Sequence, residues 1–408
     1  MRILHTSDWH LGQYFYGKTR LHEHQQFLTW LLTQVDQQQI EVIIVAGDIF
    51  DTGSPPSYAR ALYHDFVVQL QQYSCQLVVL AGNHDSVAML AESQQLLAKL
   101  STHVVTHVSQ DTPIPLVFTS QRDNAQKVIV CAIPFIRARD VMHSSAGQSA
   151  QQKQQTLQQA ISEYYQRSFQ QAQQLSAAHN NAPIVMTGHL TTVGVSRSDS
   201  VRDIYIGSLE AFPANAFPAA DYIALGHIHQ AQIVAKQANI RYSGSPIALS
   251  FDELKQPKSV TFIDFKGAKT HISTVNIPSF QPMAMVKSTL DKLAEQLIQL
   301  AAELVDEQVM WLDIEIDSGD YLTDLQARVQ AMIGDLPLEV LLLRRKKKTR
   351  TTDAQPLQQL SLGEISLAEV FANRLALESF IDNEGLARKQ RLEQLFNTIV
   401  GELEQTAK

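Results

Sequence analysis

Short apolar runs that end in a glycine and a polar residue constrain the fold of this chain more than any other feature. Residues 40–46 form a β-branched run that ends in Gly47-Asp48, and residues 77–81 form another that ends in Gly82-Asn83. Residues 57–72, between the two runs, have the composition of a helix. Wholly apolar strands are typical of a sheet covered on both faces, and strand–helix alternation is typical of layered folds. The sequence therefore predicts an α/β fold.

The same pattern continues along the chain. Further strands are predicted at residues 128–132, 184–187 and 222–225, and antiparallel strands over residues 240–275. Residues 150–177 are rich in Gln and Ala and lack Pro and Gly, which favours a long solvated helix over a low-complexity segment.

A boundary is expected near residues 278–282, followed by a smaller unit. Strands at 283–287, 309–317 and 338–343 alternate with helices at 288–303 and 321–333, which predicts a compact βαβαβ unit. The basic run 344–350 is either a phosphate-binding segment or a solvated linker. The last predicted helix has an apolar stripe that favours docking on a partner over packing within the chain, formed by Leu392, Leu395, Phe396, Ile399, Val400 and Leu403.

Composition bounds the classes of protein that fit. A length of 408 residues predicts two or three domains. The net charge of −8 lacks the basic footprint of many nucleic-acid-binding proteins, although bound metal ions would add local positive charge. Two cysteines, Cys75 and Cys131, do not make a disulfide framework and are expected to be buried core thiols. No leader or membrane-length apolar run is recognised, so a cytoplasmic protein without a membrane partner is expected.

Five motifs of metal-ligand residue types follow apolar runs directly. They are Asp8-Trp9-His10, Gly47-Asp48-Ile49-Phe50-Asp51, Gly82-Asn83-His84-Asp85, Gly188-His189 and Gly226-His227-Ile228-His229. Because sites in α/β sheets form at the carboxyl ends of strands, we expect the motifs to converge on one edge. The set of carboxylate, amide and imidazole groups suits Mn, Fe or Zn. Seven candidate ligands are too many for one ion, which predicts two ions that share a carboxylate.

The remaining histidines lack a preceding glycine at a strand end. We interpret them as structural or solvated residues, and they are His5, His22, His24, His64, His103, His107, His143, His179 and His271.

The order of the five motifs resembles that of the calcineurin-like metallophosphoesterases over residues 1–250. Segments 7–12, 53–58, 203–207 and 243–246 are also similar to the SbcD family of bacterial nuclease subunits, and the likeness extends to the C-terminal unit. The resemblance implies a layered β-sandwich flanked by helices over residues 1–280. It also implies a small α+β capping domain that binds DNA at 281–345, and a linker with C-terminal helices at 346–408.

The resemblance also implies roles for single residues. Asp8, His10 and His229 would hold the first metal ion, Asn83, His189 and His227 would hold the second, and Asp48 would bridge the two. The usual metal of such a site is Mn²⁺. His84 would be a catalytic residue that is not a ligand and that assists either the leaving oxygen or the charge of the transition state. We expect the carboxylate of Asp51 to orient the His84 ring.

The implied function is that of a Mn²⁺-dependent DNA nuclease in repair, recombination and replication. It would act with the ATPase SbcC as an ATP-dependent exonuclease on double strands and an endonuclease on hairpins and single strands. Dimerisation is also implied, with residues 57–72 as one possible surface. The aromatic and basic residues Tyr14, Lys18 and Arg20 and the loop residues Arg197 and Arg202 are candidate DNA contacts.

Two alternatives remain at the level of sequence. One is another two-metal phosphoesterase, acting on a phosphoprotein or a cyclic nucleotide. However, phosphoprotein phosphatases of the superfamily typically have Arg-Gly after GDxxD and GNHE in the next motif, whereas this chain has Thr52-Gly53 and Asp85. The other alternative is a non-catalytic scaffold at DNA ends, which the retention of all seven candidate ligands disfavours.

Overall fold

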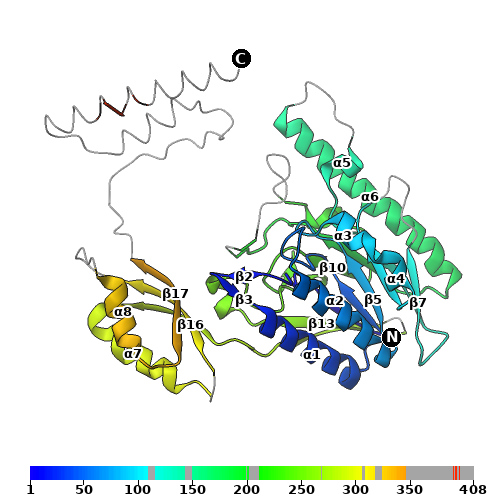
Figure 1. Ribbon diagram of the computed structural model, residues 1–408. Coiled ribbons are helices and arrows are strands. Elements are labelled where there is room, and N and C mark those ends of the chain that lie inside the picture. The colour runs from blue at the N-terminus through cyan, green and yellow to red at the C-terminus, as the bar shows by residue number, and fades with distance from the viewer. Residues whose placement is uncertain are drawn as a thin grey trace. The chain divides into compact units, whose positions relative to one another are not determined.

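The computed structural model describes residues 1–108, 115–142, 149–198, 200–201, 211–267, 269–305, 308–317 and 324–345, together with residues 389, 391, 392 and 395. Two six-stranded sheets form the larger part of this structure (Figure 1). The first sheet has the order β14(Lys269–Asn276), β13(Ser259–Lys266), β1(Arg2–Thr6), β4(Val42–Val45), β5(Gln76–Leu80) and β6(Thr102–Val105). In this sheet β1, β4, β5 and β6 run parallel, and β13 pairs antiparallel with both β1 and β14.

The second sheet has four parallel strands flanked by two antiparallel edge strands. Its order is β11(Gln232–Val234), β12(Gln237–Tyr242), β10(Tyr222–Gly226), β9(Ile184–His189), β8(Lys127–Cys131) and β7(Leu116–Thr119). The α/β prediction is confirmed. The expectation of antiparallel strands over residues 240–275 is right for β13 and β14, but β12 pairs parallel with β10.

Apolar side chains fill three layers around the two sheets. A cluster between the sheets includes Ile44, Val78, Val130 and Ala224, which belong to strands of both sheets. Helices α1(Leu21–Gln38) and α2(Ser57–Leu70) cover the outer face of the first sheet, and α6(Ala150–Ala178) covers that of the second. The strands are therefore buried on both faces, as their wholly apolar composition predicts.

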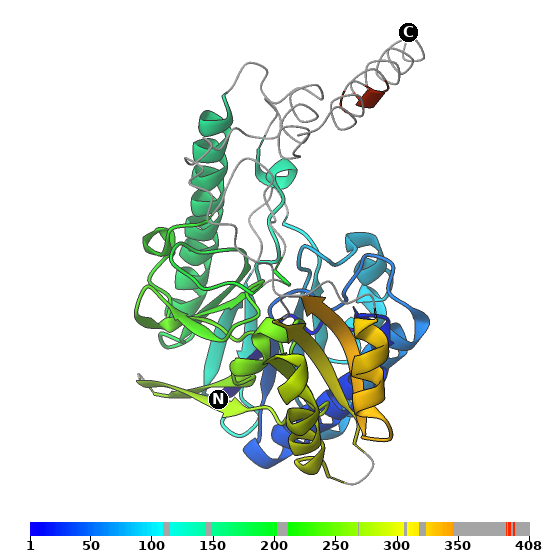
Figure 2. The ribbon, with the colours of Figure 1, turned by 90° about the vertical axis from the view of Figure 1, so that its left-hand side faces the viewer.

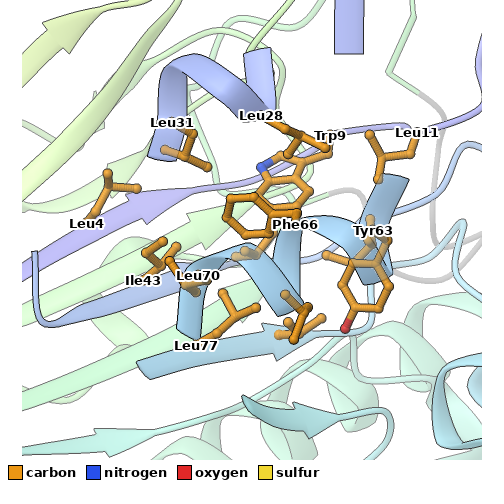
Figure 3. Packing of buried hydrophobic residues seen from close by; sticks show 14 of the residues in the cluster. Leu4, Trp9, Leu11, Leu28, Leu31, Ile43, Tyr63, Phe66, Leu70 and Leu77 are labelled. Carbon is orange, nitrogen blue, oxygen red and sulfur yellow. The ribbon is translucent and has the colours of Figure 1, made fainter. Parts of the chain in front are cut away.

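The layer beneath α1 and α2 also anchors the first ligand motif. Figure 3 shows Trp9 among side chains from both helices and from the strands. The Trp9 ring is fully buried, lies edge-on to Phe27 and Phe66, and donates from Nε1 to Thr6 Oγ1 at 3.0 Å. Since Trp9 stands between Asp8 and His10, burial of its ring fixes the backbone of both candidate ligands.

Helix α6 has the length that its Gln- and Ala-rich composition predicts. It begins after Ser149, whose Oγ accepts a hydrogen bond from the Gln152 backbone N–H while the Gln152 side chain accepts from the Ser149 N–H. This capping box satisfies backbone donors that the first turn leaves free. One face of the helix, which includes Leu157, Ile161 and Tyr165, is buried against the second sheet.

A smaller three-stranded parallel sheet follows residue 282. Its order is β15(Met283–Ser288), β16(Met310–Ile316) and β17(Leu338–Arg345), connected by α7(Leu290–Ala302) and α8(Leu325–Ile333) (Figure 2). Leu312, Ile314 and Ile316 are fully buried in its core with residues of both helices. This is the βαβαβ unit expected from the strands and helices predicted over residues 283–343.

A hairpin that the sequence did not predict follows the first ligand motif and packs against this smaller unit. Its strands are β2(Tyr14–Phe15) and β3(Lys18–Thr19). The Phe15 ring stacks on that of Trp311 with 5.9 Å between centroids, and Lys18 Nζ lies 2.5 Å from Glu339 Oε1. The remaining short helices are η1(Gln71–Tyr73), α3(Val87–Glu92), α4(Gln94–Ala98), α5(Ala138–Val141), η2(Ala214–Ala216) and η3(Phe251–Lys255).

Several predictions fall outside the described residues. These are the contact by Arg202, the basic residues 346–350, and almost all of the linker and helices expected at 346–408. Both cysteines are buried free thiols, as expected. Among the helices that the structure describes, none combines the length and apolar character needed to span a bilayer.

Candidate metal centre

The two large sheets contribute their candidate ligands from the carboxyl ends of parallel strands. Asp8 and His10 follow β1, Asp48 follows β4 and Asn83 follows β5, all in the first sheet. His189 ends β9, and His227 and His229 follow β10, in the second sheet. The motifs thus meet at one end of the sandwich, which is the convergence that the sequence predicted.

The backbone turns sharply at several of these positions. Asp8, His10, Asp48 and His227 have φ angles of 54°, 46°, 52° and 93°, in the left-handed region that non-glycine residues seldom adopt. Such conformations persist only where the surrounding structure imposes them, and they are concentrated at functional sites.

One glycine permits a close approach that any other residue would block. A Cβ atom on Gly82 would lie 2.1 Å from Oδ1 and 2.4 Å from the backbone N of Asp48. The loop after β5 can therefore pack against the loop after β4 only because residue 82 lacks a side chain.

The candidate ligands form two groups. Atoms of Asp8, His10 and His229 lie within 4.8 Å of one another, and so do atoms of Asp48, His189 and His227. Asn83 Oδ1 joins the second group, at 2.9 Å from His189 Nε2 and 3.2 Å from His227 Nδ1. All seven residues are thus brought together, in the same partition that the family resemblance implied.

The carboxylate of Asp48 lies between the groups. Its Oδ2 atom is 3.7 Å from His10 Nε2 in the first group and 3.1 Å from His189 Nε2 in the second. Its Oδ1 atom accepts a hydrogen bond of 2.9 Å from the His84 backbone N–H, which fixes the plane of the carboxylate. A single carboxylate oxygen therefore faces ligands of both groups.

The electrostatics of the centre suit cations. His10 Nε2 and His227 Nε2 are buried without a hydrogen-bond partner, a costly arrangement unless another group engages such atoms. Burial by itself would lower the pKa of His189, but the charge of Asp48 and the hydrogen bond to it prevail and raise the pKa to about 9. Burial and the charge of His189 hold the pKa of His227 well below its usual value. Nitrogen and oxygen donors of this kind fit Mn, Fe or Zn ions.

Partners of the Nδ1 atoms orient three of the rings. His189 Nδ1 lies 2.9 Å from the Ala46 carbonyl oxygen, His10 Nδ1 lies 3.1 Å from Asp51 Oδ1, and His229 Nδ1 lies 3.2 Å from Glu253 Oε1. In its neutral form, a histidine whose Nδ1–H donates to oxygen has its Nε2 lone pair available for a metal ion.

The atom of Asp51 that contacts His84 is not the one expected from the sequence. The carboxylate of Asp51 lies against His10, and the main-chain carbonyl of Asp51 lies 2.7 Å from His84 Nδ1. His84 is partly exposed, and its ring lies edge-on to that of His10 with 4.7 Å between centroids. Asp51 is therefore adjacent to both histidines, through its side chain and its backbone respectively.

Two residues near the centre had no role in the sequence-based interpretation. Buried Asp85 accepts hydrogen bonds from the backbone N–H groups of Ile49, Phe50 and Gly82, which ties the second motif to the third. Burial and the charge of Asp48 raise the pKa of Asp85 to about 6. Its place in Gly82-Asn83-His84-Asp85 was the available signal. Glu253 has no such signal, because it stands 24 residues beyond His229 and outside the five motifs.

The candidate DNA contacts differ in exposure. Tyr14 is 63% exposed, Arg197 is exposed, and Lys18 is partly exposed beside Glu339. Arg20, in contrast, is 1% exposed. Its guanidinium donates to Glu23 Oε2 at 2.5 Å and to the Ala248 carbonyl at 2.9 Å, and lies over the Phe15 ring. In this conformation Arg20 packs the hairpin and cannot reach a DNA backbone, so its expected DNA contact is corrected to a structural role.

Comparison with known proteins identifies the class of this centre. Residues 1–231 match the family model described as calcineurin-like phosphoesterase, and residues 279–379 match that of the Type 5 capsule protein repressor C-terminal domain. The chain belongs to the calcineurin-like phosphoesterases, a class of hydrolases that use divalent metal ions.

Two relatives that match most of the chain show to which family within this class it belongs. The chain is 51% identical over 402 residues to the SbcD subunit of nuclease SbcCD from Escherichia coli (strain K12), covering 98% of this chain and 97% of that protein. It is 31% identical over 334 residues to the protein of the same name from Bacillus subtilis (strain 168), covering 79% of this chain and 81% of that protein. Within the phosphoesterases, the chain is a member of the SbcD family of nuclease subunits.

Proposed function

We propose that this protein is a two-metal phosphodiesterase that cleaves DNA with Mn²⁺ as its metal. The observation that carries the proposal is the position of Asp48, whose Oδ2 lies 3.7 Å from His10 Nε2 and 3.1 Å from His189 Nε2. A carboxylate oxygen placed between two ligand groups is what a pair of ions at about 3.5–4 Å requires. Asp8, His10 and His229 would hold one ion, and Asn83, His189 and His227 the other.

When bound, the ions would supply Lewis acidity toward the phosphoryl oxygens and lower the pKa of a nucleophilic water. His84 would act on the opposite, leaving oxygen. Its Nδ1–H donates to the Asp51 carbonyl, so in the doubly protonated imidazolium form the proton on Nε2 would pass to the departing 3′-oxygen and leave a neutral ring protonated on Nδ1. Asp51 would hold His10 through its carboxylate and His84 through its main-chain carbonyl.

Similarity over nearly the whole chain to relatives named nuclease supports DNA as the substrate. The same similarity supports a complex with SbcC, in which cutting would depend on ATP. The activities would be those of a double-strand exonuclease and a hairpin and single-strand endonuclease, in repair, recombination and replication. Exposed Tyr14 and Arg197 and partly exposed Lys18 are the candidate contacts to the DNA backbone and bases.

The proposed division of the chain follows the same family. Residues 1–280 would form the nuclease domain, residues 281–345 a DNA-binding capping domain, and residues 346–408 the segment that docks on SbcC. A homodimer of nuclease domains is also proposed. Helix α2, which exposes 58% of Val68, is a candidate surface for it.

The test is cleavage of a hairpin-ended DNA duplex by the purified protein with Mn²⁺ or Mg²⁺, alone and with SbcC and ATP. A small phosphodiester and a phosphomonoester are assayed in parallel. Mn²⁺-dependent cutting that SbcC and ATP enhance is the expected result. Intact DNA together with rapid phosphomonoester hydrolysis would assign the protein to the phosphatases instead, and inactivity on all substrates would favour a scaffold.

A further inference from the structure

A fully buried carboxylate, Glu253, lies behind the first ligand group. It belongs to η3(Phe251–Lys255), and its side chain is 0% exposed. Its Oε1 atom is 3.2 Å from His229 Nδ1. A buried carboxylate is costly unless it is paired and hydrogen-bonded, so its position requires specific partners.

Besides His229, two loops supply hydrogen-bond donors to Glu253. From the loop after β9, the hydroxyls of Ser198 and Ser200 donate to Oε1 at 2.7 and 2.5 Å. From the loop after β12, the Ser245 hydroxyl and the Leu249 backbone N–H donate to Oε2 at 3.3 and 3.1 Å. The carboxylate thus ties these loops to the ring of His229.

Lys258 completes the network with a charge of opposite sign. Its Nζ donates to Glu253 Oε2 at 2.5 Å, to Ser245 Oγ at 2.8 Å and to the His229 carbonyl at 3.1 Å. The ammonium neutralises the carboxylate and also holds the backbone of the candidate ligand. Both the ring and the main chain of His229 are therefore fixed from one side.

This geometry determines the tautomer of the imidazole. The hydroxyls of Ser198 and Ser200 and the Lys258 ammonium donate to Glu253, so its Oε1 faces His229 Nδ1 as an acceptor. Ser200 Oγ lies closer to His229 Nδ1, at 2.6 Å, and with its hydrogen directed to Glu253 it is an acceptor there too. Both oxygens favour a proton on Nδ1. Nε2 then has its lone pair directed away from Glu253. Atoms of Asp8 and His10 lie within 4.8 Å of the ligand atom of His229.

We infer that Glu253 is a positioning residue for the first metal ion. Directly and through the Ser200 hydroxyl that it orients, Glu253 holds His229 as the Nδ1–H tautomer, so that Nε2 can bind the ion. The inference rests on the proposed role of His229 as a ligand. It gives this ion two carboxylate-oriented histidines, since Asp51 faces Nδ1 of His10 in the same way. Second-sphere carboxylates of this kind strengthen metal binding by about 10- to 100-fold.

The test compares Mn²⁺ binding to the wild-type protein and to Glu253→Gln, with free Mn²⁺ followed by its electron paramagnetic resonance signal. Glutamine keeps the volume of the side chain but removes the charge. The wild type is expected to bind two ions, and the variant to bind one ion normally and the other about 10- to 100-fold more weakly.

Asp264→Asn is the matched control. Asp264 is also a buried carboxylate in an ion pair, with Arg2 Nε at 2.6 Å, but Arg2 is the first residue of β1 and lies at the end remote from Asp8. Asp264→Asn is expected to bind both ions as the wild type does. Equal affinities in Glu253→Gln and the wild type would overturn the inference. A wild type that binds fewer than two ions would contradict the proposed function instead.

A second measurement determines the tautomer in the wild-type protein itself. In the metal-free wild-type protein at pH 9, ring nitrogen chemical shifts report which atom of each histidine is protonated. The His229 signals are assigned by their loss in His229→Gln. A proton on Nδ1 is the expected result, and a proton on Nε2 would refute the role given to Glu253.

Discussion

Replacing Gly82 with alanine should impair catalysis by displacing Asp48. The added Cβ would lie 2.1 Å from Asp48 Oδ1, about 0.9 Å short of the 3.0 Å below which such contacts essentially never occur, and 2.4 Å from its backbone N. Because one of the opposing atoms is backbone, rotation of a side chain cannot relieve the clash. Either the loop after β5 or the carboxylate that faces both ligand groups has to move.

The expected magnitude follows from that displacement. A misplacement of about 1 Å at a catalytic centre can reduce the rate by about 100-fold, equivalent to about 2.7 kcal/mol in the activation barrier. Overpacking should also reduce the free energy of unfolding by about 1–3 kcal/mol. The assay is kcat/KM for a small phosphodiester at saturating Mn²⁺, with the number of bound ions counted in parallel.

Gly53→Ala provides the matched control. A Cβ on Gly53 meets its nearest atom, Ser86 Cβ, at 3.6 Å, an ordinary van der Waals contact, although Gly53 lies in the same region as Asp51 and His84. Its activity should remain close to that of the wild type. Gly82→Ala with unchanged kcat/KM and two normally bound ions would refute the argument that close packing of these loops positions Asp48.

Four further variants and one pH series test the geometry of the centre and of the hairpin beside it. His84→Ala should retain both Mn²⁺ ions but lose most turnover, whereas Asp48→Ala should lose at least one ion, as measured by metal counting and kinetics. Arg20→Met should reduce the free energy of unfolding by about 3–5 kcal/mol in denaturant titrations, because it leaves buried Glu23 unpaired. Lys18→Ala removes the ion pair with Glu339, in which both side chains are about 40% exposed, and should change the free energy of unfolding by less than about 1 kcal/mol. Mn²⁺ affinity should rise by up to about tenfold per pH unit from pH 7 to 9, because metal-free His189, with a pKa of about 9, must lose a proton to bind.

Each of these has a result that would contradict it. Poor metal binding by His84→Ala would make His84 a ligand, and full metal occupancy in Asp48→Ala would exclude bridging. An Arg20→Met protein as stable as the wild type but defective in DNA binding would restore the DNA contact first expected for Arg20. Calorimetry in buffers of different ionisation enthalpy tests the proton release, and an affinity that stays constant from pH 7 to 9 would argue against a protonated His189.

The sequence was informative about the centre because its motifs are local. Asp48 and Asn83 directly follow apolar strands, and the carboxyl ends of parallel strands share one edge, so their convergence follows from strand direction alone. Local pattern also predicts α6 and the smaller unit, where the periodicity of apolar residues determines which face is buried.

Contacts between distant segments were not accessible in this way. The hairpin at residues 14–19 is stabilised by Trp311, nearly 300 residues away along the chain, and it buries Arg20, which sequence alone suggested as a DNA contact. Likewise, whether the side chain or the carbonyl of Asp51 reaches His84 depends on where His10 lies.

The sequence by itself thus determined the α/β class, the apolar strands that precede the ligand motifs and the identities of seven candidate ligands, because strand periodicity and motif spacing are properties of neighbouring residues. Only the tertiary structure decided that two stacked sheets share the centre, that Asp48 faces both ligand groups, and that Glu253 lies behind His229. Those relations depend on packing between segments far apart in the chain. Packing of that kind is set by the whole core, which no local pattern encodes.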